Sequence, residues 1–213
     1  MGEYLKGAMF EGIGTSGKTT TMLELKKLQT ENMNNERSLI VLSEQYSQVL
    51  NSVSGKVISM EQNAHIELLG KRIEMIEQLN EYACSLGSDY SLRARGLFVI
   101  FERFYLNHIK CFNNFDNDKV INLAKRINKL GLKNILLTIS DDNIINRLKA
   151  RNPNIFDGMT KEEITLKCNA RIKEQNTLIE TAKQSHIPTL IINTDSLEWE
   201  KYAKSSMEYT QTN

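Results

Sequence analysis

The strongest chemical signal in the sequence is a glycine-rich segment near the amino terminus. The pattern GxxxxGK followed by Ser or Thr is matched without a gap by Gly12-Ile13-Gly14-Thr15-Ser16-Gly17-Lys18-Thr19. Glycines let consecutive backbone N–H groups turn toward a phosphate, and a helix that begins at Gly17 adds the positive end of its dipole. We expect Lys18 to reach the β- and γ-phosphates of a nucleotide and the Thr19 hydroxyl to ligate Mg²⁺. Gly12 to Thr20 are therefore the predicted donor-binding residues.

Charged residues also stand where two other predicted strands end. Glu102 and Arg103 follow the apolar run 97–101, and Glu44 follows the run 38–43. The carboxyl ends of parallel strands meet at one edge of a sheet, so these side chains should surround the same cleft as the glycine-rich loop. The alternative for Glu102 and Arg103 is an ordinary surface ion pair.

Two arginines form a candidate phosphate clamp. Arg147 and Arg151 are four residues apart, so they share one face of a predicted helix that stops at a loop around Pro153. Planar guanidinium groups can fork onto phosphate oxygens, which favours a lid over the donor. The alternative is a solvated basic face. Lys167 and Arg171 repeat the spacing on the next helix, where we do expect a solvated face.

The motifs and their order resemble those of thymidylate kinases and the related deoxynucleoside kinases, which are small P-loop phosphotransferases. The resemblance is carried by Phe10-Glu11-Gly12, Ser16-Gly17-Lys18-Thr19-Thr20, Val99-Ile100-Phe101-Glu102-Arg103, Ile139-Ser140-Asp141-Asp142 and Arg147-Leu148-Lys149-Ala150-Arg151. It implies ATP as the phosphoryl donor and Mg²⁺ as the metal. Glu102 would help organise Mg²⁺, and Arg103 would hold the acceptor or the transferring phosphate. A mobile lid would cover about 147–160.

The sequence departs from both families around the acceptor. Thymidylate kinases usually carry Asp where this chain has Gly14, and an Arg-Glu-Pro cluster follows their second strand. Here Ser43-Glu44-Gln45 follows that strand and more closely resembles the Glu-Pro of deoxynucleoside kinases, whose Glu acts as a base toward the sugar hydroxyl. Phe104 stands where those kinases place Ser. Glu44 is therefore the candidate base, and a nucleoside is favoured over a nucleoside monophosphate as the acceptor.

The periodicity of the chain predicts elements that can hold these residues together. Short apolar runs alternate with longer amphipathic stretches, which predicts an α/β fold of three layers, with a five-stranded parallel sheet between helices. Strands are predicted at 6–11, 38–43, 97–101, 134–139 and 187–192. One helix is predicted to begin at Gly17, and three others are predicted over 61–86, 120–130 and 160–184, the last opened by a capping box. Two more helices are predicted after capping residues, one after Asp141 or Asp142 and one after Asp195 or Ser196. Residues 45–56 read as a loop or a short irregular helix.

Length and charge limit the classes of protein to consider. The 213 residues suit a single domain, placed at 1–204, with a polar and frayed tail at 205–213. Lys plus Arg total 27 against 26 for Asp plus Glu, so no bulk charge favours polymeric nucleic acid or a membrane surface. There is no signal core and no apolar run of about 20 residues. Three scattered cysteines do not make a disulfide framework, so we expect a cytoplasmic protein.

We therefore predict an ATP-dependent kinase of a nucleoside or nucleoside monophosphate. The predicted catalytic residues are Lys18, Glu44, Arg103, Arg147 and Arg151. A kinase of a small non-nucleotide hydroxyl compound would use the same donor half. A nucleotide-binding regulatory protein would also keep the loop, but the paired arginines favour phosphoryl transfer.

The 61–86 helix offers a surface for a second subunit. Its apolar seam consists of Ile66, Leu69, Ile73 and Ile76, which repeat at helical spacing. The seam could pack on the sheet or on another copy of the chain, as in the helix-mediated dimers common in the resembled family. A homodimer through this helix is thus a further prediction.

Overall fold

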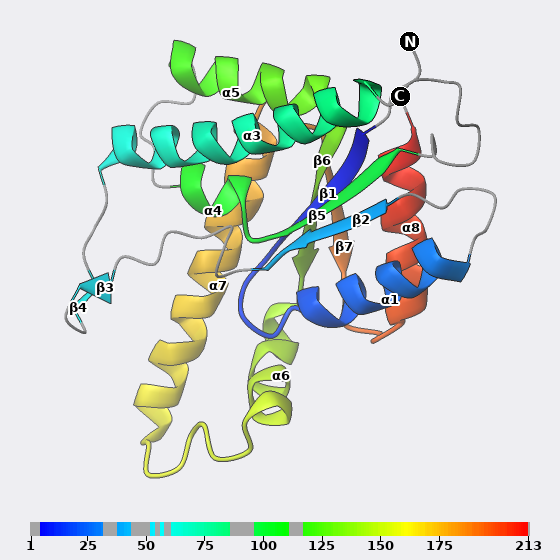
Figure 1. The fold of residues 1–213 in the computed structure, drawn as a ribbon. Coiled ribbons are helices and arrows are strands. Elements are labelled where there is room, and N and C mark those ends of the chain that lie inside the picture. Colours follow the sequence, from blue (N-terminus) through cyan, green and yellow to red (C-terminus); the bar gives the residue numbers. More distant parts are fainter. Residues whose placement is uncertain are drawn as a thin grey trace.

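A computed structural model of the chain describes residues 5–31, 38–43, 52–53, 56–57, 61–85, 96–110 and 117–212. The predicted α/β fold is confirmed. Five parallel strands lie in the order β2–β5–β1–β6–β7 (Figure 1). Their bounds are β1 Leu5–Glu11, β2 Ser38–Leu42, β5 Leu97–Glu102, β6 Leu132–Thr138 and β7 Thr189–Asn193. Each strand begins and ends within about two residues of its predicted range.

The central strand β1 shows why the short apolar runs become buried strands. Successive side chains of a strand point to opposite faces, so both faces of a central parallel strand must be apolar. Ala8 and Phe10 pack into the core on one face of the sheet. Leu5 and Met9 pack into the core on the other face. An unbroken apolar run therefore marks a strand that is covered by helices on both sides.

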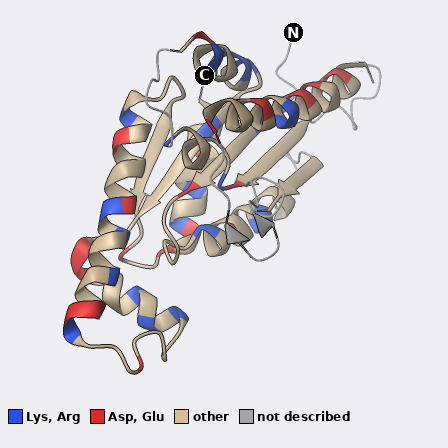
Figure 2. Ribbon diagram, turned by 90° about the vertical axis from the view of Figure 1, so that its left-hand side faces the viewer, with Lys and Arg blue, Asp and Glu red and all other residues tan. Residues whose placement is uncertain are grey.

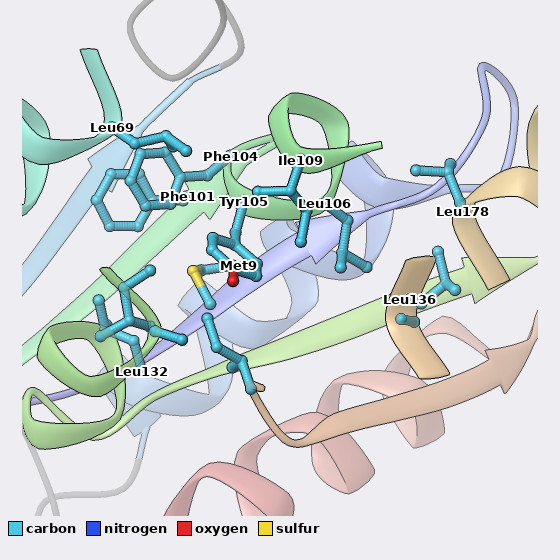
Figure 3. Packing of buried hydrophobic residues seen from close by; sticks show 14 of the residues in the cluster. Met9, Leu69, Phe101, Phe104, Tyr105, Leu106, Ile109, Leu132, Leu136 and Leu178 are labelled. Atoms are coloured by element: carbon cyan, nitrogen blue, oxygen red, sulfur yellow. The ribbon is translucent and has the colours of Figure 1, made fainter. Parts of the chain in front are cut away.

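Helices form a layer on each face of the sheet (Figure 1). One layer consists of α1 Lys18–Glu31 and α8 Trp199–Gln211. The other consists of α3 Gln62–Ser85, α4 Tyr105–Ile109, α5 Asp118–Lys129 and α7 Lys161–Gln184. Figure 3 shows the larger core, in which strand residues meet residues of the covering helices, among them Met9, Phe101, Leu136, Leu69, Leu106 and Leu178. No helix in the described ranges is both long and apolar enough to cross a bilayer.

A helical hairpin projects beyond the sheet edge at the carboxyl ends of the strands (Figures 1 and 2). It consists of α6 Ile144–Arg151, the connection 152–160 and the first turns of α7. The predicted capping box of α7 is confirmed, because the Thr160 hydroxyl and the Glu163 carboxylate bond to each other's backbone N–H groups. The predicted Asp cap of α6 is wrong. Asp141 starts a short 3₁₀ turn, η1 Asp141–Asn143, and α6 follows it without a side-chain cap.

The carboxyl terminus differs from the prediction in two ways. Neither Asp195 nor Ser196 caps α8, because the Asp195 carboxylate accepts the Ser140 N–H at 3.1 Å and the helix begins only at Trp199. The predicted frayed tail is also wrong, because α8 continues to Gln211. Two buried hydroxyls of this stretch donate to carbonyl oxygens of the same helix, which lets these polar side chains be buried; they belong to Ser206 and Thr210.

Besides η1, the described residues include two further small features that were not predicted. One is the five-residue helix α4, directly after β5. The other is an antiparallel pair, β3 Ser52–Val53 and β4 Lys56–Val57, which overlaps the end of the stretch 45–56 that was predicted to be a loop or a short irregular helix. Both are too short to show a hydrophobic period in the sequence.

The apolar seam of α3 packs inside the chain. Leu69, Ile73 and Ile76 are fully buried in the core, and Ile66 packs against them. The seam was predicted to pack either on the sheet or on a second copy of the chain, and it packs inside the domain. A homodimer through the 61–86 helix stays a prediction.

Candidate functional site

The glycine-rich segment forms the turn from β1 into α1, at the carboxyl end of the central strand. Gly12 has a φ of +138°, and a Cβ there would lie 2.4 Å from the Leu137 carbonyl oxygen. Gly17 has a φ of +88°, and its Cβ would lie 2.2 Å from the Trp199 ring. Only glycine fits both positions, so the loop backbone can approach β6 and α8 this closely.

Lys18 is the first residue of α1 and is only 5% exposed. Its ammonium donates to the carbonyl oxygens of Gly12 at 3.0 Å and Ile13 at 2.9 Å. The side chain therefore folds back along the loop that precedes it. A positive charge is held at the inner wall of the loop, where anionic ligands would gain most from it.

Thr19 and Glu102 join the loop to the end of β5. The Thr19 hydroxyl donates to a Glu102 carboxylate oxygen at 2.9 Å. Hydroxyl and carboxylate oxygens are the ligand types that Mg²⁺ prefers. Among the described residues, no three His, Cys, Asp or Glu side chains gather as a metal site.

Two guanidinium groups converge over the middle of the loop. A Cβ at Gly14 would lie 3.8 Å from Nη1 of Arg151 and 3.9 Å from Nη2 of Arg103. Arg103 comes from the end of β5 and Arg151 from the last turn of α6. The strand end and the hairpin therefore bring two charges to one point. Gly14 is where thymidylate kinases usually carry Asp, so here the two cations meet a position without a carboxylate.

Arg147 contacts the loop in a different way. Its guanidinium donates to the Thr15 carbonyl oxygen at 3.0 Å and to the Thr194 carbonyl oxygen at 3.4 Å, and lies 5.1 Å from the Trp199 ring centre. Burial lowers the pKa of Arg147, an effect that the nearby Asp195 carboxylate opposes. Thr15 has a φ of +77°, which is uncommon for a residue other than glycine. Arg147 thus braces a strained peptide of the loop.

These groups line a single cavity of about 470 Å³. The lining consists of Thr15, Gly17, Lys18, Thr19, Thr20, Glu102, Arg103, Arg147, Ala150, Arg151, Leu197 and Trp199. Four cationic side chains face one carboxylate, so the cavity favours a polyanionic ligand. The structure therefore brings together four of the five predicted catalytic residues. The fifth, Glu44, lies outside the described residues.

The sequence prediction missed the aromatic wall of this cavity. Trp199 contacts Tyr202 of the same helix α8, with ring centres 5.7 Å apart. It also covers Gly17 and lines the cavity beside Leu197, which is exposed. The signal in the sequence was its position, a few residues beyond a predicted strand, where parallel sheets bind their ligands.

The tip of the hairpin is tied to α7. Lys167 donates to the Ile155 carbonyl oxygen at 3.1 Å and lies 5.5 Å from the Phe156 ring centre, and Phe156 is buried. The expected solvated face is therefore wrong for Lys167, because the connection 152–160 folds back onto it. The predicted mobility of this segment stays a prediction.

Two of the three histidines of the chain lie against each other. Nδ1 of His65 on α3 lies 2.9 Å from Nδ1 of His108 on α4. In this hydrogen bond one Nδ1 atom donates and the other accepts, so only one of the two Nδ1 atoms carries a proton. Burial lowers the pKa of His65, which agrees with a neutral pair. The pair joins two helices of one layer and does not line the cavity.

Comparison with known proteins supports the fold but not a closer relationship. No protein-family profile and no curated protein sequence matches this chain. The YorR protein of Bacillus subtilis, solved in complex with phosphorylated GDP, matches with a TM-score of 0.58 and 14% identity over 96% of this chain and 95% of its own. Thymidylate kinase of Candida albicans matches with a TM-score of 0.50 and 16% identity over 100% of this chain and 94% of its own. The chain has the fold of the P-loop nucleotide kinases.

Proposed function

We propose that the protein transfers the γ-phosphoryl group of ATP to a nucleoside or a nucleoside monophosphate. The observation that carries this proposal is the cavity in which Lys18, the Thr19–Glu102 pair and the arginines of β5 and α6 converge on the glycine-rich loop. Phosphoryl transfer needs positioning and charge neutralisation more than covalent chemistry, and this set of residues supplies both.

Each residue has a role in the proposed reaction. The loop amides and Lys18 bind the donor phosphates, and Arg103 and Arg151 neutralise charge on the phosphoryl group as it moves. Arg147 holds the shape of the loop through Thr15 and also reaches the moving phosphoryl group. Because charge spreads over the equatorial oxygens in the transition state, fixed cations on several sides stabilise it more than they stabilise the bound donor.

The residues fit a magnesium ion as the metal. Thr19 and Glu102 would hold it, since their oxygen atoms already lie together at the cavity wall. When bound, the ion supplies charge neutralisation between the donor phosphates. The protein itself keeps the Thr19 hydroxyl and the Glu102 carboxylate facing the loop.

The acceptor side rests on two residues with opposite implications. Glu44 as a base would favour an acceptor hydroxyl, as in a nucleoside, because a hydroxyl must lose a proton to attack. Arg103, beside Gly14, would favour an anionic acceptor such as a monophosphate, which needs cations instead. Exchange of Glu44 for Gln should lower kcat about 10²–10⁴-fold with a nucleoside as acceptor and have little effect with a monophosphate.

The first test uses the single tryptophan of the chain as a reporter of donor binding. Because Trp199 covers Gly17 and lines the cavity, ATP with Mg²⁺ should change its fluorescence in a saturable way. Lys18→Ala is the matched control and should weaken this binding at least about tenfold, since a buried charge-assisted contact to phosphate is lost. A wild-type protein whose fluorescence and heat of mixing do not respond to ATP or GTP would overturn donor binding.

The second test identifies the reaction. ATP labelled in the γ-phosphate is incubated with Mg²⁺ and separate panels of nucleosides, nucleoside monophosphates and small alcohols. We expect labelled product in one of the first two panels, and loss of it in Lys18→Ala. Labelled product only from a small alcohol would replace the nucleotide acceptor, and donor binding without any transfer would favour a regulatory protein.

A further inference from the structure

Glu11 is a fully buried carboxylate that the proposed reaction does not use. It is the last residue of β1, immediately before the glycine-rich loop, and it does not line the cavity. One of its oxygens accepts the backbone N–H groups of Phe104 at 3.0 Å and Leu106 at 2.9 Å. The other accepts the Asn107 amide at 2.9 Å. All three donors belong to the segment that follows β5.

This segment contains the turn that carries Arg103. Arg103 has a φ of +54°, in the left-handed region that residues other than glycine seldom adopt. Its own N–H donates to the Phe10 carbonyl oxygen at 2.8 Å, and the next N–H in the chain is the one that Glu11 accepts. A strained residue persists only when its surroundings fix it, and here β1 fixes the backbone on both sides of it.

The turn sends two neighbouring side chains in different directions. Arg103 goes to the cavity and lies over Gly14. Phe104 goes to the core, where its ring stacks on Phe101 with centres 4.2 Å apart. Without the left-handed residue, the chain would continue along the direction of β5, and the guanidinium would not be aimed back at the loop.

We propose that Glu11 is a positioning residue, whose carboxylate holds the Arg103–Phe104 turn and thereby aims Arg103 at the cavity of the glycine-rich loop. This inference rests on the proposed phosphoryl transfer. It explains why a carboxyl group is buried where an apolar side chain would cost less, because only an acceptor of several hydrogen bonds can satisfy three donors at this turn.

The same contacts continue to α7. The Asn107 side-chain oxygen accepts Lys110 at 3.1 Å, Lys110 lies 3.7 Å from Glu174, and Glu174 accepts Arg171 at 2.7 Å. Asn107 therefore donates to Glu11 with one end of its amide and accepts with the other. An exchange that makes residue 11 a donor would conflict with Asn107 as it stands, and this conflict allows a rescue experiment.

The decisive test is a double-mutant cycle between Glu11→Gln and Arg103→Ala, measured as kcat for phosphoryl transfer. Glu11→Gln keeps the shape but sets an NH₂ group against the Asn107 amide, and should lower kcat about 10–100-fold, since small misplacements in such sites cost this much. If Glu11 acts through Arg103, the double variant should lie within about threefold of Arg103→Ala. Two losses that simply multiply would overturn the inference.

Rescue and a control separate positioning from loss of fold. Adding Asn107→Asp to Glu11→Gln restores a donor facing an acceptor, and should return most of the lost kcat. Asn134→Ala removes a buried polar side chain of β6, two strands away from β5, and should leave kcat within about threefold. If Glu11→Gln with Asn107→Asp does not recover kcat, or if Asn134→Ala loses as much kcat as Glu11→Gln, Glu11 has a structural role only and the inference is overturned.

Hydrogen exchange keeps this inference apart from the proposed function. The amides of Phe104 and Leu106 should be strongly protected in the wild type and exchange at least about tenfold faster in Glu11→Gln, with Arg103→Ala unchanged. If the wild type transfers no phosphate to any acceptor, the proposed function fails and with it the positioning role. If transfer occurs but these amides exchange equally fast in wild type and variant, only the role of Glu11 fails.

Discussion

The three glycines of the loop differ in whether a side chain could replace their hydrogen. Gly12 and Gly17 have backbone angles and neighbours that exclude a Cβ, whereas Gly14 has only the two guanidinium groups near it, at ordinary contact distance. Steric needs therefore explain the first two glycines. Gly14 matters for charge, since any side chain placed there would stand between Arg103 and Arg151.

A charge at position 14 should consequently act on anion binding. Gly14→Asp adds a carboxylate between the two arginines and should weaken binding of ATP or of an anionic acceptor about tenfold or more. Gly14→Ala is the matched control, because it adds the same Cβ without charge, and should bind within about threefold of wild type. Titrations followed by Trp199 fluorescence measure both. Equal weakening by the two variants would mean that space, not charge, decides.

Glu11 gives the protein a pH dependence whose sign follows from burial. Burial raises the pKa of Glu11 to about 7 from 4.5, although the amides of Leu106 and Phe104 and the charges of Lys18 and Lys110 all lower it. Between these two values the folded state binds a proton that the unfolded state does not. The resulting stabilisation is complete below pH 4.5 and is lost as the pH rises through 7.

The free energy of unfolding of the wild type, relative to Glu11→Gln, should therefore fall between pH 4.5 and 7. The expected change is about 3 kcal/mol. Urea unfolding of both proteins at several pH values measures it, and taking the difference cancels the histidines, which titrate in the same range. Parallel curves for the two proteins would show that Glu11 does not change its protonation on folding.

Among the helices and strands, those whose formation depends on nearby residues could be predicted from the sequence. Each of the five strands contains a short continuous apolar run, and α7 carries its own capping box, so both could be predicted from the sequence. The short helix α4 could not, because the acceptor for its first amides is Glu11, over ninety residues earlier. The start of α8 failed for a similar reason, since Asp195 bonds to Ser140 instead of to its own helix.

The hairpin of α6 and α7 is the element whose behaviour on donor binding can be tested most directly. Its connection is held by Lys167 through Ile155 and Phe156. Lys167→Met keeps the aliphatic length and removes the charged donor, so the tip should be cleaved faster by protease at residues 151–159. A non-hydrolysable ATP analogue should slow that cleavage in the wild type, because Arg147 and Arg151 would hold the hairpin to the phosphates. Cleavage that is indifferent to the analogue would contradict a lid.

At the scale of the whole molecule, the candidate site is a product of topology. Residues of the loop, of β5, of α6 and of the turn before α8 are far apart in sequence and meet because their strands are parallel and end at one edge. Thr194 joins three such segments, because its hydroxyl lies 3.0 Å from the carbonyl oxygen of Ser16 in the loop and 3.0 Å from that of Thr138 at the end of β6. The sequence indicated that Lys18, Arg103, Arg147 and Arg151 lie at this edge of the sheet, but the strand order that joins them depends on long-range packing and has no local signal.

A ligand that bridges these segments should stabilise the entire domain, because it binds only when all of them are in place. ATP with Mg²⁺ at a hundredfold excess over its Kd should add about 2.7 kcal/mol to the free energy of unfolding. For a chain of this length that corresponds to a rise in Tm of about 5–10 °C. Adenosine at the same concentration lacks the phosphates and should give almost no shift. Lys18→Ala should lose most of the shift with ATP, since the inner wall of the loop no longer carries a charge. If adenosine raises Tm as much as ATP does, the base and not the phosphates is being bound, and the cationic cavity is not the donor site.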